Sequence, residues 1–276
     1  MNLKRAFAGA TAMLMAGAAN AQANVPVSLW RLDCGKIVAF DLDEFSDTRA
    51  YVGQHRDLAA SCYLIRHGDT YMLWDTGIPE SALNHVPDPK EGLDAVLTVT
   101  ITDQLAKVGL KPEQIGLVGI SHYHFDHTGQ APRFPQAKLL LGKGDVDYLR
   151  ANDPARAKPL EHWLSGRGAM EAVVGDKDIF GDGSVVMIDL PGHTPGHHGL
   201  LVKLAHKGYV LLSGDAAHFT QNYETNGVPS FNTSRADTLA SLDRFKKLAA
   251  NLHATVIIQH EPADVAKLPA FPKAAD

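Results

Sequence analysis

The sequence has few cysteines, no long apolar run and no excess of basic charge. Cys34 and Cys62 are the only cysteines in 276 residues, and they lack the Cys-x-x-Cys spacing of zinc and redox sites. No apolar run reaches the roughly 20 residues that span a bilayer. The formal net charge of −5, without any basic block, argues against nucleic acid and anionic membrane surfaces as partners.

The first 23 residues have the pattern of a cleaved secretory leader. Lys4 and Arg5 precede an apolar run of small residues at 6–19, and two overlapping Ala-x-Ala sites end at Ala21 and Ala23. A membrane anchor is the alternative, but the run is too short to span a bilayer. We therefore expect cleavage after Ala21 or Ala23, no stable membrane anchor, and a periplasmic or secreted protein. Loss of the leader changes the formal charge from −5 to −7.

Export bears on the two cysteines, because an oxidising compartment allows Cys34 and Cys62 to form a disulfide. Both lie in strand-like apolar segments, where a free cysteine is also an ordinary buried residue. The sequence leaves both alternatives open, since it does not give the distance between the two Cα atoms.

Residues 24–276 contain no repeat, low-complexity segment or Pro/Ser-rich linker, which predicts a single domain with a sizeable core. The clearest helical patterns are at 100–110, with Gly109 just after the helix end, and at 233–252, with Ser234 as N-cap. The order of elements predicts two sheets with helices packed outside them, a layered α/β sandwich. The strands are predicted at 36–40, 61–68, 70–77, 117–121, 137–142, 184–190, 198–205, 208–215 and 255–260.

Three histidines and one aspartate occur within six residues in the stretch SHYHFDHTG. His122 and His124 are two apart at a strand end, so both side chains can leave the same face and converge on one ion. Asp126 and His127 follow where the chain turns towards a helix, and they can point to a second position. Zinc takes about four ligands, so the cluster predicts further ligands elsewhere.

Three such candidates, His193, Asp215 and His260, each follow a predicted strand. Side chains from several strand ends can meet at one edge of a sheet, so we expect a binuclear centre there. His197 and His198 are expected to have orienting or surface roles near it. The remaining histidines are interpreted as ordinary surface or core residues: His55, His67, His85, His162, His206 and His253.

These motifs resemble those of the metallo-β-lactamase superfamily over essentially the whole mature chain. The resemblance implies an αββα four-layer sandwich that holds two divalent ions, zinc first, with Co, Mn or Fe as alternatives. It also implies that Asp75 of the WDTG motif supports the site. By resemblance, one ion is bound by His122, His124 and His193, the other by Asp126, His127 and His260, and Asp215 bridges them.

Two such ions can share a water and lower its pKa, which makes hydrolysis by a bridging hydroxide the expected reaction, with Asp126 also managing protons. Known metallo-β-lactamases lack an aspartate like Asp215, and diiron flavoproteins have an acid in place of His124. Glyoxalase-type thioesterases carry a C-terminal extension, for which the 16 residues after His260 are too few.

The chain is most similar to the N-acyl homoserine lactonases, the quorum-quenching enzymes, through LDCG, WDTGIPES, PGHTPGHHGLL and SGDAAHFTQNYE. This similarity implies opening of the lactone ring of an N-acyl homoserine lactone, a possible homodimer, and an acyl pocket lined by 41–61. Many lactonases have a tyrosine where this chain has His218, which is either a catalytic hydrogen-bond donor or a pocket wall. Other predicted wall residues are Phe125, Phe219 and Tyr223.

Two other functions stay open. One is an exported hydrolase of the same fold that acts on β-lactams, aryl esters or phosphodiesters. The other is a periplasmic metal-binding protein without catalytic turnover.

Overall fold

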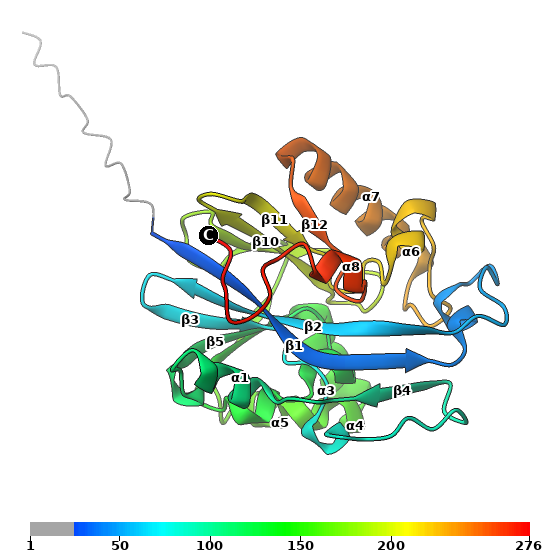
Figure 1. Cartoon of the computed structure of the whole chain (residues 1–276), viewed down its shortest axis with the longest axis horizontal. Coiled ribbons are helices and arrows are strands. Elements are labelled where there is room, and N and C mark those ends of the chain that lie inside the picture. The colour runs from blue at the N-terminus through cyan, green and yellow to red at the C-terminus, as the bar shows by residue number, and fades with distance from the viewer. Residues whose placement is uncertain (1–24) are drawn as a thin grey trace, which may run out of the picture.

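The computed structural model describes residues 25–276, which form two mixed sheets packed face to face with helices outside (Figure 1). The predicted leader, residues 1–23, lies outside the described residues. The first sheet has the strand order β4-β1-β2-β3-β5-β6-β7, and the second has the order β12-β11-β10-β9-β8. The strands β3, β5, β6 and β7 run parallel to one another, as do β11 and β12.

The strands of the first sheet are β1 (Val27–Ala39), β2 (Arg56–His67), β3 (Thr70–Trp74), β4 (Leu93–Val96), β5 (Ile115–Ile120), β6 (Lys138–Gly142) and β7 (Met170–Val173). Those of the second are β8 (Lys177–Asp178), β9 (Val185–Asp189), β10 (His198–Leu204), β11 (Gly208–Leu212) and β12 (Thr255–Ile257). The helices are α1 (Ile101–Lys107), α2 (Phe125–Thr128), α3 (Lys143–Asn152), α4 (Pro154–Ala157), α5 (Glu161–Leu164), α6 (Thr220–Thr225), α7 (Arg235–Leu252) and α8 (Pro262–Val265). Short 3-10 turns are η1 (Leu42–Phe45), η2 (Glu80–Ala82), η3 (Pro112–Gln114), η4 (Ala131–Arg133) and η5 (Lys158–Leu160).

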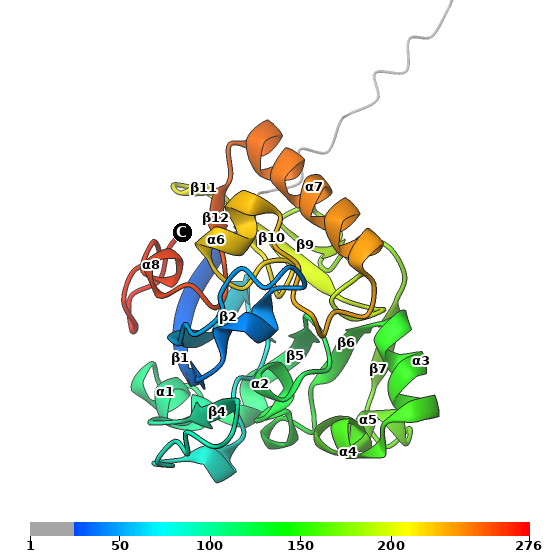
Figure 2. The ribbon, with the colours of Figure 1, turned by 90° about the vertical axis from the view of Figure 1, so that its right-hand side faces the viewer.

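The alternation of side chains along β2 shows how the layers form. Cys62 and Leu64 belong to the apolar cluster under α1, α3 and α5, whereas Tyr63 and Ile65 belong to the cluster between the two sheets. Successive strand residues point to opposite faces, so one strand serves both cores. On the far side, Phe245 of α7 packs against the outer face of the second sheet. The order helix, sheet, sheet, helix is the predicted four-layer sandwich (Figure 2).

The two clearest helical patterns have the predicted ends. The Ser234 side chain accepts a hydrogen bond from the Asp237 N–H, 3.2 Å away, at the start of α7. Gly109 has φ +73° directly after α1 and its C-cap, a conformation that glycine adopts without strain.

Cys34 and Cys62 form a disulfide between β1 and β2, which settles the alternative that the sequence left open. Their Cα atoms lie 5.9 Å apart, and both residues are fully buried beneath α1. The antiparallel register brings Leu32 opposite Cys62, and Cys34 lies within the irregularity between Asp33 and Lys36, so the bridge joins the neighbouring strands at that irregularity.

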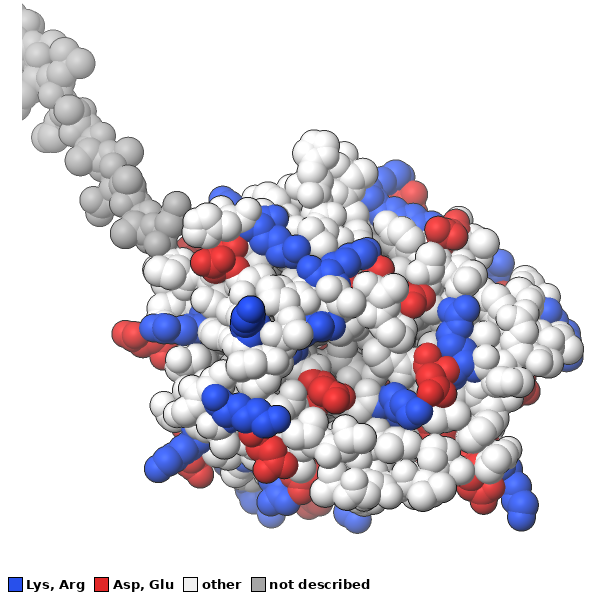
Figure 3. Space-filling view, viewed as in Figure 1, with Lys and Arg blue, Asp and Glu red and all other residues white. Residues whose placement is uncertain are grey.

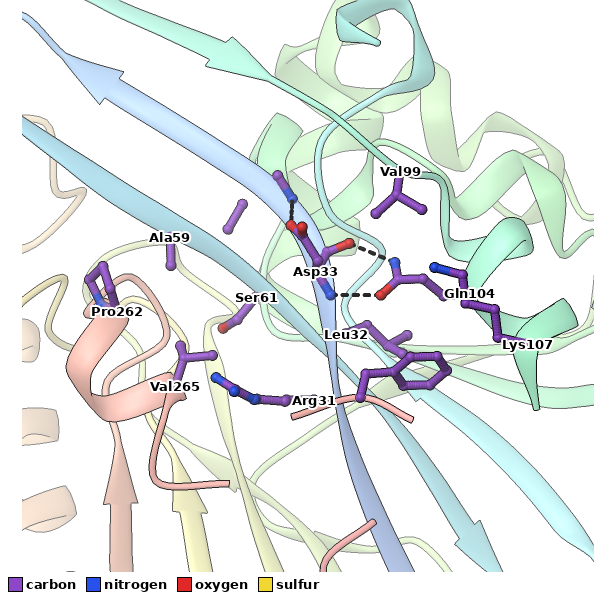
Figure 4. A pocket seen from close by; sticks show the side chains of 13 residues that line it. Arg31, Leu32, Asp33, Ala59, Ser61, Val99, Gln104, Lys107, Pro262 and Val265 are labelled. Atoms are coloured by element: carbon purple, nitrogen blue, oxygen red, sulfur yellow. Dashed lines mark hydrogen bonds between the residues drawn. The ribbon is translucent and has the colours of Figure 1, made fainter. Parts of the chain in front are cut away.

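On the face shown in Figure 3, acidic and basic side chains are interspersed around a central hollow. A cavity of about 470 Å³ lies over β1 and β2, between α1 and α8, with Arg31, Asp33, Ser61 and Gln104 among its lining residues (Figure 4). None of the predicted metal ligands lines this cavity. Among residues 25–276, no helix is long and apolar enough to cross a bilayer.

Candidate metal centre

The seven predicted metal ligands meet at one edge of the molecule. The segment 121–129 follows β5 of the first sheet, whereas His193, Asp215 and His260 follow β9, β11 and β12 of the second. The structure groups them into one set with His122, His124, His193 and Asp215, and another with Asp126, His127 and His260. All are buried except His124, which is partly exposed.

Three imidazoles of the first set face one another. His193 Nε2 lies 3.1 Å from His122 Nε2 and 2.9 Å from His124 Nδ1, and the last two atoms are 3.0 Å apart. Nitrogens bound tetrahedrally to zinc at ~2.0 Å are ~3.3 Å apart, so this spacing fits a shared cation. Burial, and then the neighbouring imidazoles, holds the pKa of His122 and His124 well below the usual range, which leaves neutral nitrogens with free lone pairs.

The second set joins a carboxylate with two imidazoles. Asp126 Oδ2 lies 3.3 Å from His127 Nε2 and 3.5 Å from His260 Nε2. No hydrogen-bond partner satisfies His127 Nε2 among the described residues, although the atom is buried. A buried imidazole nitrogen without a hydrogen bond, aimed at carboxylates, is expected of a metal ligand.

Asp215 lies between the two sets. Its Oδ1 is 3.2 Å from His127 Nε2 and 3.0 Å from His260 Nε2, whereas its Oδ2 is 3.3 Å from His193 Nε2. Burial opposes ionisation of Asp215, but the surrounding imidazoles outweigh it and hold its pKa well below the usual range. Each oxygen of one ionised carboxylate thus faces one set, an arrangement that fits a dinuclear metal site.

Asp75 of the WDTG motif supports His127. Asp75 Oδ2 lies 2.9 Å from His127 Nδ1 and accepts a hydrogen bond from Gln259 Nε2 at 2.9 Å, whereas Oδ1 accepts one from the Ser121 N–H at 2.7 Å. Such partners fix the ring orientation of a ligating histidine.

Other ligands are held in the same way. His260 Nδ1 lies 2.6 Å from the carbonyl oxygen of Ala59, and His193 Nδ1 lies 2.8 Å from Asn232 Oδ1. The buried His197 accepts a hydrogen bond from the Asp215 N–H at 2.8 Å, which gives it an orienting role. Asn232 and Gln259 gave no signal in the sequence, because their roles depend on where their loops lie.

The remaining histidines stay outside both sets. His198 is buried, with its ring nitrogens near the carbonyl oxygens of Gly196 and Gly175. His67 stacks on Phe180. The other five are exposed or partly exposed: His55, His85, His162, His206 and His253.

A cavity of about 380 Å³ opens onto the two sets. Its polar lining includes His124, Asp126, Asp215, His218, His260, Glu44, Tyr123, Tyr148, Arg156 and Thr233, and its apolar lining is Ile37, Phe45, Leu58, Leu93, Phe125 and Phe231. The segment 41–61, which was predicted to line an acyl pocket, contributes Glu44, Phe45 and Leu58 to this cavity.

Among the predicted wall residues, Phe125 lines the cavity but Phe219 and Tyr223 do not. Phe219 is fully buried against Phe45 and Tyr51, and Tyr223 packs on Phe245 of α7.

His218 lines the cavity beside Asp215. Its Nε2 lies 3.1 Å from Asp215 Oδ2, and its ring packs edge-on against Phe45 with centroids 5.0 Å apart. Burial is the main cause that lowers the pKa of His218 to about 4, so the imidazole is neutral.

The layered fold and the two sets of ligand candidates, both contacted by Asp215, are those of a class of protein, the metal-dependent hydrolases. The pattern of the Metallo-beta-lactamase superfamily matches residues 55–260, and the chain belongs to this superfamily.

Several relatives are named as N-acyl homoserine lactonases. The chain is 29% identical over 240 residues to N-acyl homoserine lactonase AttM of Rhizobium radiobacter, covering 79% of this chain and 89% of the relative. It is 28% identical over 221 residues to an N-acyl homoserine lactonase of a Bacillus species, covering 76% and 84%. A structure of N-acyl homoserine lactone hydrolase with N-hexanoyl-L-homoserine at its catalytic metal centre has a TM-score of 0.78 at 23% identity, covering 91% of this chain and 99% of that one. AidC, a dizinc quorum-quenching lactonase, has a TM-score of 0.66 at 19% identity, covering 91% and 90%.

Proposed function

We propose that this protein hydrolyses N-acyl homoserine lactones by opening the lactone ring. The observation that supports the proposal is the pair of His/Asp sets, which are joined by the carboxylate of Asp215. Both sets lie at one end of a cavity that has several apolar side chains in its walls. The named activity of the curated relatives supports the same substrate class.

For the metal centre, we propose that His122, His124 and His193 hold one ion, that Asp126, His127 and His260 hold the other, and that Asp215 binds both. Zinc suits this His/Asp set, and Co, Mn or Fe also accept it. Two bound divalent ions supply Lewis acidity towards a carbonyl oxygen and lower the pKa of water towards neutrality.

Asp126 is placed to move the proton. Its carboxylate belongs to the second set and also lines the cavity, so it can face both the attacking water and the ring oxygen. In the proposed reaction, water adds to the lactone carbonyl carbon and the ring C–O bond breaks. Asp126 passes the proton of that water to the departing alkoxide, and the new carboxylic acid releases one proton to solvent.

His218 is proposed to donate a hydrogen bond to the lactone from the cavity wall. A neutral imidazole carries one N–H, so it can replace the phenol that related lactonases place here. The apolar side chains of Phe45, Phe125 and Phe231 are proposed to hold the acyl chain.

The test uses the mature chain with two equivalents of zinc and N-hexanoyl homoserine lactone in weakly buffered solution. We expect one proton released per lactone consumed and a product that has gained one water. His122→Ala is the control, and we expect it to lose this activity. Absence of proton release with every acyl chain length tried would contradict the proposal.

Parallel assays separate the alternatives. Turnover of nitrocefin or of a chromogenic phosphodiester, without lactone turnover, would favour another hydrolase of this fold. Full metal content without turnover of any of these substrates would favour a metal-binding protein.

A further inference from the structure

The buried carboxylate of Asp145 lies on α3, outside both sets of ligands. Its side chain is 0% exposed, and no Lys or Arg of the described chain forms an ion pair with it. Taking a carboxylate out of water without a cation is costly unless hydrogen bonds or a nearby positive charge compensate it.

Polar groups from two loops, the segment 121–129 and the segment 191–197, converge on this carboxylate. Asp145 Oδ1 accepts from the Gly196 N–H at 2.7 Å, and Oδ2 accepts from Thr194 Oγ1 at 2.9 Å. The backbone N–H of Tyr123 also faces this carboxyl group and opposes the rise in the pKa of Asp145 that burial causes. Tyr123 lies between the first two histidines of the H-x-H motif, and Thr194 directly follows His193.

Glycines bring the start of α3 directly against the loop that contains Pro195 and Gly196. A Cβ on Gly144 would collide with the Pro195 carbonyl, and one on Gly142 would collide with the Gly196 carbonyl. A Cβ on Gly196 would in turn meet the Asp145 backbone nitrogen. The two backbones therefore touch with no side chain between them, which leaves the loop little freedom to shift.

The supports of the two sets differ. Asp75 contacts His127 of the second set. Asp145 instead contacts residues adjacent in sequence to His122, His124 and His193, the three imidazoles of the first set.

We propose that Asp145 is a positioning residue for the first set: by tying residues 121–129 to residues 191–197, it fixes the spacing of the three imidazoles. This inference rests on the proposed metal ligation and does not depend on the identity of the substrate. The charge of an ion held by these imidazoles would also compensate the buried carboxylate.

The experiment compares Asp145→Asn with Thr194→Val and with the matched control Asp147→Asn. Asp147 lies on the same helix, is exposed, and pairs with Lys143. The two stepwise Zn²⁺ affinities of each mature variant are measured by competition with a chelator, without substrate. We expect Asp145→Asn to weaken one affinity roughly 10-fold to 100-fold, the loss usual for such supporting groups, and to change the other by less than about threefold.

The same substitution in the His193→Ala variant shows to which set of imidazoles the loss of affinity belongs. In His193→Ala, where the first set is already broken, Asp145→Asn should cause no further loss of the remaining affinity. Thr194→Val should weaken the same affinity by less than Asp145→Asn does, and Asp147→Asn should leave both unchanged.

Unchanged affinities in Asp145→Asn would overturn the proposal. An equal loss at both sites, together with a lower melting temperature of the metal-free protein, would also overturn it by showing a general structural role. If Asp145→Asn does not fold, unchanged affinities in Thr194→Val would overturn it. Because no substrate is used, failure of lactone hydrolysis leaves this result unaffected.

Discussion

Asp215 contacts both sets of ligand candidates, whereas a ligand of a single ion would contact only one. Its two oxygens face imidazoles of different sets, and His197 fixes its backbone nitrogen. The side chain is 4% exposed, so water cannot readily take its place.

Asp215→Asn therefore tests the shared carboxylate. The amide keeps the shape but loses the charge and one ligating oxygen, so we expect metal content after dialysis to fall from two equivalents to less than about one. His193→Ala, which removes a ligand from one set only, should retain about one equivalent. Elemental analysis of both variants measures this, and equal metal content in the two would contradict a shared role.

Phe231 lies at the mouth of the cavity. Its ring is 40% exposed and packs edge-on against Phe45, with centroids 5.4 Å apart. We expect Phe231→Ala to raise KM about tenfold for a decanoyl substrate, because the lost apolar contact is worth about 1.5 kcal/mol. The KM for a butanoyl substrate should change little. Val174→Ala, at an exposed site outside this cavity, is the control, and equal changes for both substrates would exclude a role in holding the chain.

Among the elements, the pairing of β1 with β2 carries the disulfide. Replacing both Cys34 and Cys62 by Ala should lower the free energy of unfolding by about 3 to 4 kcal/mol, the loop-closure value for a separation of 28 residues. Urea denaturation with and without reductant measures the loss. Reductant should destabilise only the wild-type chain, and an equal effect on the double variant would show that the bridge does not contribute.

Elements with strong local signals could be predicted from the sequence. The run at 61–68 lies largely within β2, and Ser234 marks the start of α7. β7 and β8 were missed because they are short and rich in Glu, Lys and Asp, and only pairing with distant strands makes them strands. The helices between 143 and 164 were also missed, because Pro154 and Pro159 divide them into short pieces.

In the candidate site, too, residues with a local sequence signal could be predicted, whereas residues whose role depends on distant contacts could not. The seven metal-ligand candidates could be found because they follow strands in a characteristic order. The wall prediction for Phe219 was wrong because its backbone is extended, so its side chain points away from the cavity that His218 faces. Asp145 was missed because nothing in the sequence shows that α3 contacts the loop after β9.

At the scale of the whole molecule, the seven ligand candidates follow strands of both sheets, so ions bound to them would join the two halves. Chelation should therefore lower the melting temperature. With free metal at about 1,000 times its Kd, the lost stabilisation is about 4 kcal/mol for each ion. Thermal unfolding with EDTA, followed by added zinc, measures the loss and its recovery. EDTA should shift Asp215→Asn much less, and an equal shift would argue against metal linkage.

Export is the remaining proposal at this scale. The chain expressed from Met1 in a Gram-negative host should be recovered from the periplasm or medium, beginning at Gln22 or Asn24 and with Cys34 and Cys62 oxidised. Mass spectrometry of the intact protein measures both features. A cytosolic product that keeps residues 1–23 would contradict export.

The walls of the cavity and its metal-ligand candidates belong to different parts of the chain. Phe45 and Phe231 come from connecting segments, whereas His193, Asp215 and His260 follow strands anchored in a packed sheet. Substitutions of wall side chains such as Phe45 and Phe231 therefore remove none of the metal-ligand candidates, whereas Asn232, beside Phe231, contacts His193 and has less freedom to change. Evolution or an engineer can alter which molecules this cavity accepts while retaining the metal-ligand candidates at its base.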